Sequence, residues 1–200
     1  MNNPDAAQND KGRLAPPVRF WHLAIIILVL AALFTGEGAD DYKKAEHAGF
    51  LLHGKIGVSV FFALCLYFVY SFFGPLEFRL MRWFPFTRER LRQTGRDLKM
   101  LASFKLPEHK RRQGLAGLVQ FFGIMVFSWL AATGTVMYFF LEPGSRASGL
   151  LHAVKEAHEV AVVLIPVYLA LHIGAVIAHS LSGHQVWREI FFLKNSAEQH

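Results

Sequence analysis

The sequence predicts an all-α integral membrane protein, a four-helix bundle with both chain ends on the cytoplasmic side. Three observations carry this prediction. Of the 200 residues, 53% are hydrophobic and 19 are phenylalanine, which favours a chain embedded in lipid over a water-soluble domain. Four apolar runs approach or exceed the roughly 20 residues that a helix needs to cross a bilayer. The Lys and Arg residues gather in one long loop, which indicates the orientation.

The predicted spans cover residues 20–36, 49–73, 115–141 and 158–181. We expect helices because a helix satisfies its own backbone hydrogen bonds in lipid. The runs are also continuously apolar, whereas the strands of a membrane barrel alternate. Residues 1–19 then form an N-terminal segment, residues 20–192 the membrane domain and residues 193–200 a short tail. The single cysteine, Cys65, excludes a disulfide within the chain.

The loops between the spans differ in charge. Residues 74–114 carry eleven Lys and Arg against four Asp and Glu, whereas residues 37–48 carry two against four. Residues 142–157 carry two of each sign. Because positive loops stay in the cytoplasm, the long basic loop and both chain ends are expected there. This topology accounts for the net charge of +6, so we expect the bilayer, and no nucleic acid, as a partner.

Histidines at two depths are the main functional feature of the sequence. His158 and His172 lie fourteen residues apart, which advances a helix by about 21 Å and returns to within roughly 40° of the same face. The predicted topology puts His53 at the outer level with His158. It puts His22 at the inner level with His172. The sequence therefore predicts an outer pair and an inner pair inside one bundle.

Two neutral imidazoles for each metal, in an apolar and aromatic surrounding, suit haem iron better than a hard cation or structural zinc. We therefore predict two haems, with His22, His53, His158 and His172 as the axial ligands. Two other interpretations of membrane histidines stay open, which are hydrogen bonds between helices and a proton path. His179, near the cytoplasmic surface, is expected to contact a haem propionate or a quinone, or to be solvated at the interface.

Several stretches around these histidines resemble a known family. They are VRFWHL at the first span, LLHGKIG in the second, GLVQFFGIMVFSWLAATG in the third, and the two histidines of the fourth. Over residues 18–192 the chain resembles the bacterial di-haem cytochrome b superfamily. That superfamily includes bacterial cytochrome b561, the cytochrome b subunits of nickel–iron hydrogenases and the gamma subunits of formate dehydrogenases.

The resemblance implies a function. The chain would carry electrons between a periplasmic oxidoreductase, formate dehydrogenase-like or hydrogenase-like with an iron–sulfur subunit, and the quinone pool. It would hold two haem b in a bacterial inner membrane. A polar residue just before the third span helps to form the quinone site in that family, and Gln113 matches its position here.

Two other functions stay open at this point. One is a stand-alone oxidoreductase of the cytochrome b561 type, which passes electrons from a small periplasmic reductant such as superoxide to quinone. The net acidic charge of residues 37–48 argues weakly against an anionic substrate. The other is a membrane protein without haem, which would leave four histidines at matching depths unexplained. Whether the chain is an enzyme by itself therefore stays open.

Overall fold

The computed structural model describes residues 16–39, 48–73, 85–107, 114–142, 145–182 and 186–191. Within these ranges the chain is helical and contains no strand, which confirms the all-α prediction. The helices are α2 (Pro16–Ala39), α3 (Ala48–Phe73), α5 (Arg88–Ala102), α6 (Gly114–Phe140), α7 (Gly149–Val162), α8 (Leu164–Leu181) and α9 (Val186–Ile190).

Four segments among the described residues are long and apolar enough to cross a membrane. They are α2, α3, α6 and the joined pair α7–α8, with mean hydropathies between 1.9 and 2.5. The second and third spans agree with the predicted bounds to within one residue at each end. The first begins four residues earlier than predicted, at Pro16, because proline fits the first position of a helix, where its missing N–H costs nothing.

The fourth span differs more from the prediction. It begins at Gly149 instead of residue 158, and it is interrupted at Val163, where α7 ends and α8 begins. Pro166 accounts for the break. It has no N–H to donate to the Val162 carbonyl, and its ring crowds that carbonyl. The Val163 N–H instead donates to the Val160 carbonyl at 3.3 Å, in a tighter turn.

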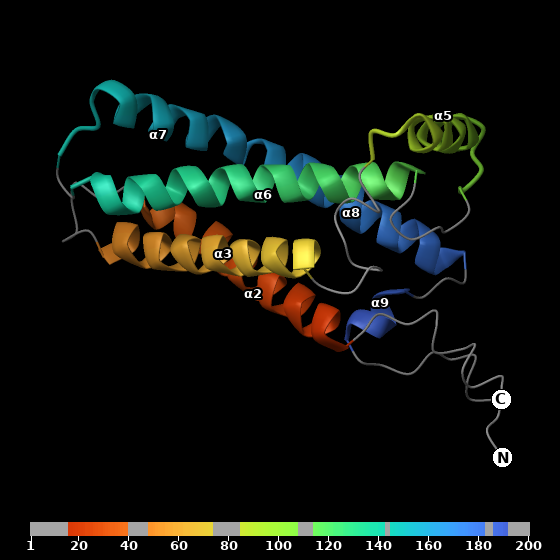
Figure 1. Cartoon of the computed structure of the whole chain (residues 1–200), viewed down its shortest axis with the longest axis horizontal. Helices are drawn as coiled ribbons and strands as arrows, with labels where there is room; N and C mark the ends of the chain where they lie inside the picture. Colours follow the sequence, from red (N-terminus) through yellow and green to blue (C-terminus); the bar gives the residue numbers. More distant parts are fainter. Residues whose placement is uncertain are drawn as a thin grey trace, which may run out of the picture.

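The spans run alternately up and down along the long axis of the molecule (Figure 1). The beginning of α2, the end of α3, the beginning of α6 and the end of α8 therefore share one end of the bundle. At the other end α2 and α3 approach closely. A Cβ on Gly49 would overlap the carbonyl of Gly38, so this approach requires glycine.

Apolar side chains fill the middle of the bundle. One cluster joins α6 to α7 and α8 through Val126, Leu130, Ala161 and Ile165. A second joins α3 to α6 through Val60, Leu64 and Ala131, with α2 packed against it. Phe127 packs against both clusters. The bundle thus has a continuous apolar layer at mid-height, and this layer separates its two ends.

Helix α5 packs against the beginning of α6, and one carboxylate bonds the two helices directly. Asp97 accepts a hydrogen bond from the Leu115 N–H at 2.8 Å, which caps the first turn of α6. The residue before Leu115, Gly114, has a φ of +55° and is packed so closely under Asp97 that an added Cβ would overlap the carboxylate. Asp97 therefore fixes α5 against the beginning of α6.

Replacing Asp97 with alanine should destabilise the protein by about 0.5–2 kcal/mol, because a helix-capping acceptor is lost. Asp97→Asn should retain most of the stability, since the amide oxygen still accepts from the Leu115 N–H. Thermal unfolding in detergent measures both variants. Equal melting temperatures for Asp97→Ala and the unmodified chain would show that the cap contributes nothing.

Candidate functional site

The structure brings the four predicted histidines together in two pairs. The rings of His22 on α2 and His172 on α8 have centroids 6.2 Å apart and planes inclined by 34°. The rings of His53 on α3 and His158 on α7 have centroids 6.4 Å apart, with planes inclined by 86°. His22 lies in the second turn of α2 and His53 in the second turn of α3. Because these two helices begin at opposite ends of the bundle (Figure 1), the two pairs lie toward opposite ends. Both pairs form although the fourth span is interrupted between His158 and His172.

His53 is oriented by helix α2. Its Nδ1 lies 3.1 Å from the carbonyl oxygen of Ala32 and 3.4 Å from the hydroxyl of Thr35. A carbonyl only accepts hydrogen bonds, so Nδ1 carries the proton and donates it. The Nε2 of the same ring then carries no proton, so it can act only as an acceptor or a metal ligand. This arrangement, in which the far nitrogen donates to a carbonyl, is how metal-binding histidines are usually held.

His158 is oriented in a similar way by α6. Its Nδ1 lies 2.9 Å from the hydroxyl of Thr133, and that hydroxyl donates to the carbonyl of Trp129 at 2.7 Å. With its own proton engaged, the Thr133 oxygen accepts from the ring, which again leaves Nε2 without a proton. The indole of Trp129 donates to the Ala157 carbonyl at 3.2 Å, which ties α7 to α6 beside the histidine.

A glycine follows each of these threonines and faces the same ring. A Cβ on Gly36 would lie 3.7 Å from Cε1 of His53, and one on Gly134 would lie 3.2 Å from Cε1 of His158. The second distance is too short for a relaxed contact. One turn after His53, a Cβ on the half-buried Gly57 would meet no atom within 4 Å. The surroundings of the outer pair are therefore kept open by missing side chains.

The inner pair is oriented by an aromatic contact. Tyr168, one turn before His172, stacks on the His172 ring with centroids 5.4 Å apart and planes inclined by 18°. The tyrosine ring lies against α6, where a Cβ on Gly123 would overlap it. His22 has a buried Nδ1 without a hydrogen-bond partner among the described residues. A buried and unsatisfied ring nitrogen is costly unless something else binds it.

The geometry fits a metal cofactor with two imidazole ligands. A transition-metal ion bonds an imidazole nitrogen at about 2 Å, so two imidazoles on opposite sides of one ion have centroids roughly 6 Å apart. Both pairs have this separation. In the described part of the chain, no group of three or more His, Cys, Asp or Glu residues could hold an ion without further ligands. Haem supplies its own equatorial ligands, whereas structural zinc requires four from the protein.

A comparison with known protein families identifies the family of this chain. A family model described as prokaryotic cytochrome b561 matches residues 13–192. The chain belongs to the prokaryotic cytochrome b561 family. It is thus a multi-pass membrane b-type cytochrome that binds haem b and takes part in electron transfer. No curated protein and no solved structure gives a match.

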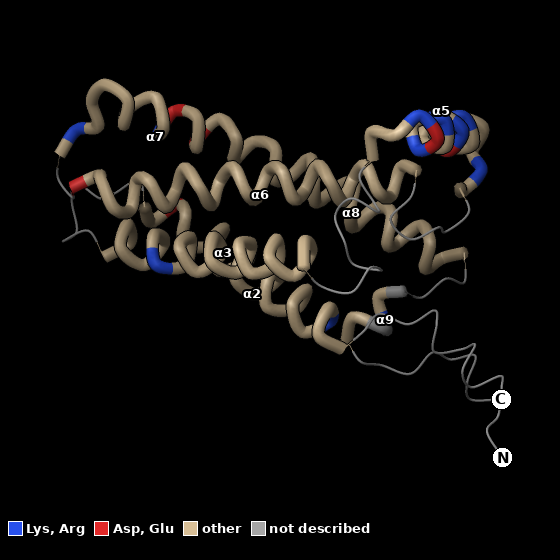
Figure 2. Tube along the Cα trace, in the orientation of Figure 1, with Lys and Arg blue, Asp and Glu red and all other residues tan. Residues whose placement is uncertain are grey.

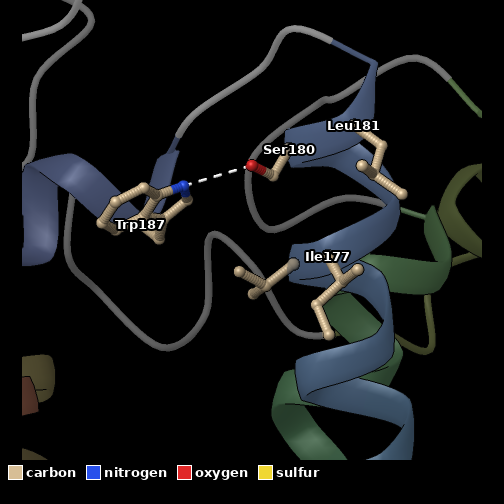
Figure 3. Close-up of a pocket in the computed structure, with 5 residues that line it drawn as sticks. Ile177, Ser180, Leu181 and Trp187 are labelled. Atoms are coloured by element: carbon tan, nitrogen blue, oxygen red, sulfur yellow. Dashed lines mark hydrogen bonds between the residues drawn. The ribbon is translucent and has the colours of Figure 1, made fainter.

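Of the two residues predicted for a quinone site in this cytochrome b561 family member, the structure describes one. Gln113 lies outside the described residues. His179 is half-buried in the last turn of α8. Beside that turn the structure shows a groove of about 270 Å³ between α8 and α9, lined by Val176, Ile177, Ser180, Leu181 and Trp187. The indole of Trp187 donates to the Ser180 hydroxyl at 3.2 Å across it (Figure 3).

Sequence reasoning missed the groups that orient the histidines of this cytochrome. They are Thr35, Thr133, Tyr168 and the Ala32 carbonyl. One pattern in the sequence pointed toward them, because the dipeptide Thr–Gly occurs near the outer end of both the first and the third span. In each case the threonine contacts Nδ1 of a histidine on the helix that follows, and the glycine faces its ring.

Replacing Thr133 with valine should destabilise this cytochrome by about 1–3 kcal/mol, because the Nδ1 proton of His158 loses its nearest acceptor. Thr35→Val should cost less, because Nδ1 of His53 lies closer to the Ala32 carbonyl, at 3.1 Å, than to the Thr35 hydroxyl, at 3.4 Å. Thermal unfolding of the two variants in detergent measures the difference. A larger loss for Thr35→Val than for Thr133→Val would contradict these hydrogen-bond assignments.

Proposed function

We propose that this protein is a di-haem electron carrier between a periplasmic oxidoreductase and the quinone pool in a bacterial inner membrane. His53 and His158 would ligate an outer haem b, and His22 and His172 an inner one. The observation that carries the proposal is the presence of two facing imidazole pairs, near opposite ends of one bundle, at the separation that a shared metal ion requires. A single histidine that only bridges two helices by a hydrogen bond would need neither a second histidine facing it nor this separation between the rings.

Haem iron supplies reversible one-electron chemistry when it is bound, and the chain sets its surroundings. The carbonyl of Ala32 and the hydroxyl of Thr133 hold two rings with Nε2 directed away from the supporting helix. Tyr168 stacks on the His172 ring and thereby fixes its orientation. The apolar layer between the pairs, which includes Val126 and Leu130, excludes water from the space between them. These features support transfer across the bilayer without a conformational change.

The proposed orientation follows from charge. The basic helix α5 lies at the end of the bundle that holds His22 and His172 (Figure 2). Because positive segments stay in the cytoplasm, that end is the inner one. The pair of His53 and His158 then lies toward the periplasm. An iron–sulfur subunit of a dehydrogenase or hydrogenase would deliver electrons there, as the resemblance to those cytochrome subunits implies.

The groove between α8 and α9 supports a quinone site at the inner end. Val176 lies one helical turn after His172, so the groove begins next to the inner pair. Its lining is apolar except for the Ser180 hydroxyl and the Trp187 indole, which suits an apolar ring with polar oxygens. His179 belongs to the same turn of α8. We therefore place the quinone headgroup in this groove.

Single substitutions of the four proposed ligands test which pair of histidines binds which haem. His22→Ala or His172→Ala should lower the haem content from two to one per chain and remove the inner haem. His53→Ala or His158→Ala should remove the outer one. Haem quantification with a redox titration of each purified variant measures this, since the two haems differ in their surroundings and hence in potential.

His152→Ala is the matched control for this series. His152 is an exposed histidine on α7, six residues before His158, and should leave both haems in place. Loss of both haems in all four ligand variants, with the helical content unchanged, would contradict the pairing. Retention of both haems in His172→Ala would remove that residue from the ligand set.

Filling the groove should impair quinone binding while leaving the haems intact. Ile177→Trp should raise the quinone concentration needed for half-maximal oxidation of the reduced protein by about tenfold or more, equivalent to about 1.4 kcal/mol. Ala175→Trp, on an exposed side of the same helix, is the control. Equal quinone dependence of both variants and the unmodified chain would place the quinone elsewhere.

A further inference from the structure

Helix α5 lies across the axis of the bundle. Figure 1 shows it almost end-on beside the beginning of α6, while the spans run along the picture. Asp97 ties it to the Leu115 N–H, and before its first turn Phe86 packs edge-on against Phe121 of α6, with ring centroids 5.2 Å apart. A helix fixed crosswise at the end of a membrane span lies parallel to the bilayer, at the level of the lipid headgroups.

One side of α5 carries three exposed leucines, around the buried Thr94 that packs under the rest of the chain. Leu91, Leu98 and Leu101 are 48%, 52% and 39% exposed, and they fall within an arc of roughly 80° at 100° per residue. The arc lies next to the side that carries Asp97 and faces α6. The leucines therefore lie beside the contact with α6 and not on the opposite side of the helix.

Another side of α5 is strongly basic. Its cations are Arg88, Arg92, Arg96 and Lys99, which are all exposed and occupy a second arc of roughly 80°. Within the described residues, none of the four makes an ion pair with an acidic side chain. The concentration of positive charge on this one helix, against the nearly uncharged spans, is plain in Figure 2. The centres of the leucine and cation arcs are about 140° apart, as in helices that lie in a membrane interface.

An exposed aromatic ring follows the helix. Phe104 has the left-handed backbone φ of +54°, which is uncommon for a bulky residue, and its side chain is fully exposed. The Phe104 N–H donates to Leu101 and the Lys105 N–H to Met100, at 3.0 and 2.9 Å, so the turn is closed in this conformation. Within the described residues nothing covers this large apolar side chain, which lies two residues after the helix that carries the leucines.

We propose that α5 and Phe104 form a membrane-surface anchor that binds anionic phospholipid. The leucine side and the Phe104 ring enter the boundary between headgroups and acyl chains, while the four cations bind the phosphate groups of anionic lipids. Each cation near an anionic bilayer surface strengthens binding, and the apolar side sets the depth. Because Asp97 joins α5 to the first turn of α6, the bound lipid also fixes the inner end of the bundle. This inference does not depend on the haem assignment.

The depth of α5 is measured with nitroxide labels on the full-length protein in liposomes of phosphatidylcholine and phosphatidylglycerol. In a Cys65→Ser background, one variant carries Leu98→Cys and the matched control carries Glu89→Cys. These two positions are nine residues apart and thus on opposite sides of the helix. The label at position 98 should collide with oxygen more than with a water-soluble nickel chelate, and the label at position 89 should show the reverse.

A nickel-accessible label at position 98 would overturn the proposal. It would mean that the leucine side faces water in the protein alone and is covered by a protein partner instead. Oxygen-rich collisions at both positions would also overturn it, because a helix sunk fully in the acyl region could not present its cations to headgroups.

The headgroup contact is tested with phosphatidylglycerol retained by the detergent-purified protein and counted by native mass spectrometry. Replacing the four cations by glutamine, in steps, should weaken retention by about fivefold for each charge removed. Arg146→Gln, an exposed cation at the other end of the bundle, should change nothing. Equal retention by the fourfold variant and the unmodified chain would refute binding of anionic lipid at α5.

Discussion

Each half-buried imidazole of the two pairs has two ring nitrogens, and each nitrogen needs a partner among the apolar helices. The two outer histidines satisfy Nδ1 with groups of the neighbouring helix, the Ala32 carbonyl and the Thr133 hydroxyl. That leaves Nε2 without a proton on both rings. Two such nitrogens cannot hydrogen-bond to each other, because both only accept. A metal ion between them satisfies both at once, and this constraint links the fold to its chemistry.

The same arrangement of a threonine followed by a glycine surrounds both histidines of the outer pair. Near the outer ends of α2 and α6, a threonine bonds its own helix carbonyl and contacts a histidine, and the next residue is a glycine that faces the ring. A larger residue at Gly134 would press on the ring of His158. The inner pair uses a stacked tyrosine instead. If each pair holds a haem as proposed, these two different surroundings would give the haems different redox potentials.

The four spans and the two levels of histidines could be predicted from the sequence, because hydrophobicity and helix periodicity are patterns that extend over long stretches of residues. The apolar runs gave the four spans, and the fourteen-residue spacing from His158 to His172 gave the two levels. The break at Val163 was missed because prolines are tolerated inside membrane helices, so Pro166 alone does not predict an interruption. Thr133 was missed because a threonine in a membrane helix usually bonds only its own helix backbone. The stacking of Tyr168 depends on how α8 packs on α6 at Gly123, which a single sequence does not show.

The central claim is that one chain holds two haems between two pairs of histidines. A pyridine haemochrome assay on the purified chain, normalised to protein by amino-acid analysis, tests it most directly. Two b-type haems per chain are expected. One haem per chain, in protein made with ample haem, would leave one facing pair without the metal ion that its geometry requires, and it would contradict the account.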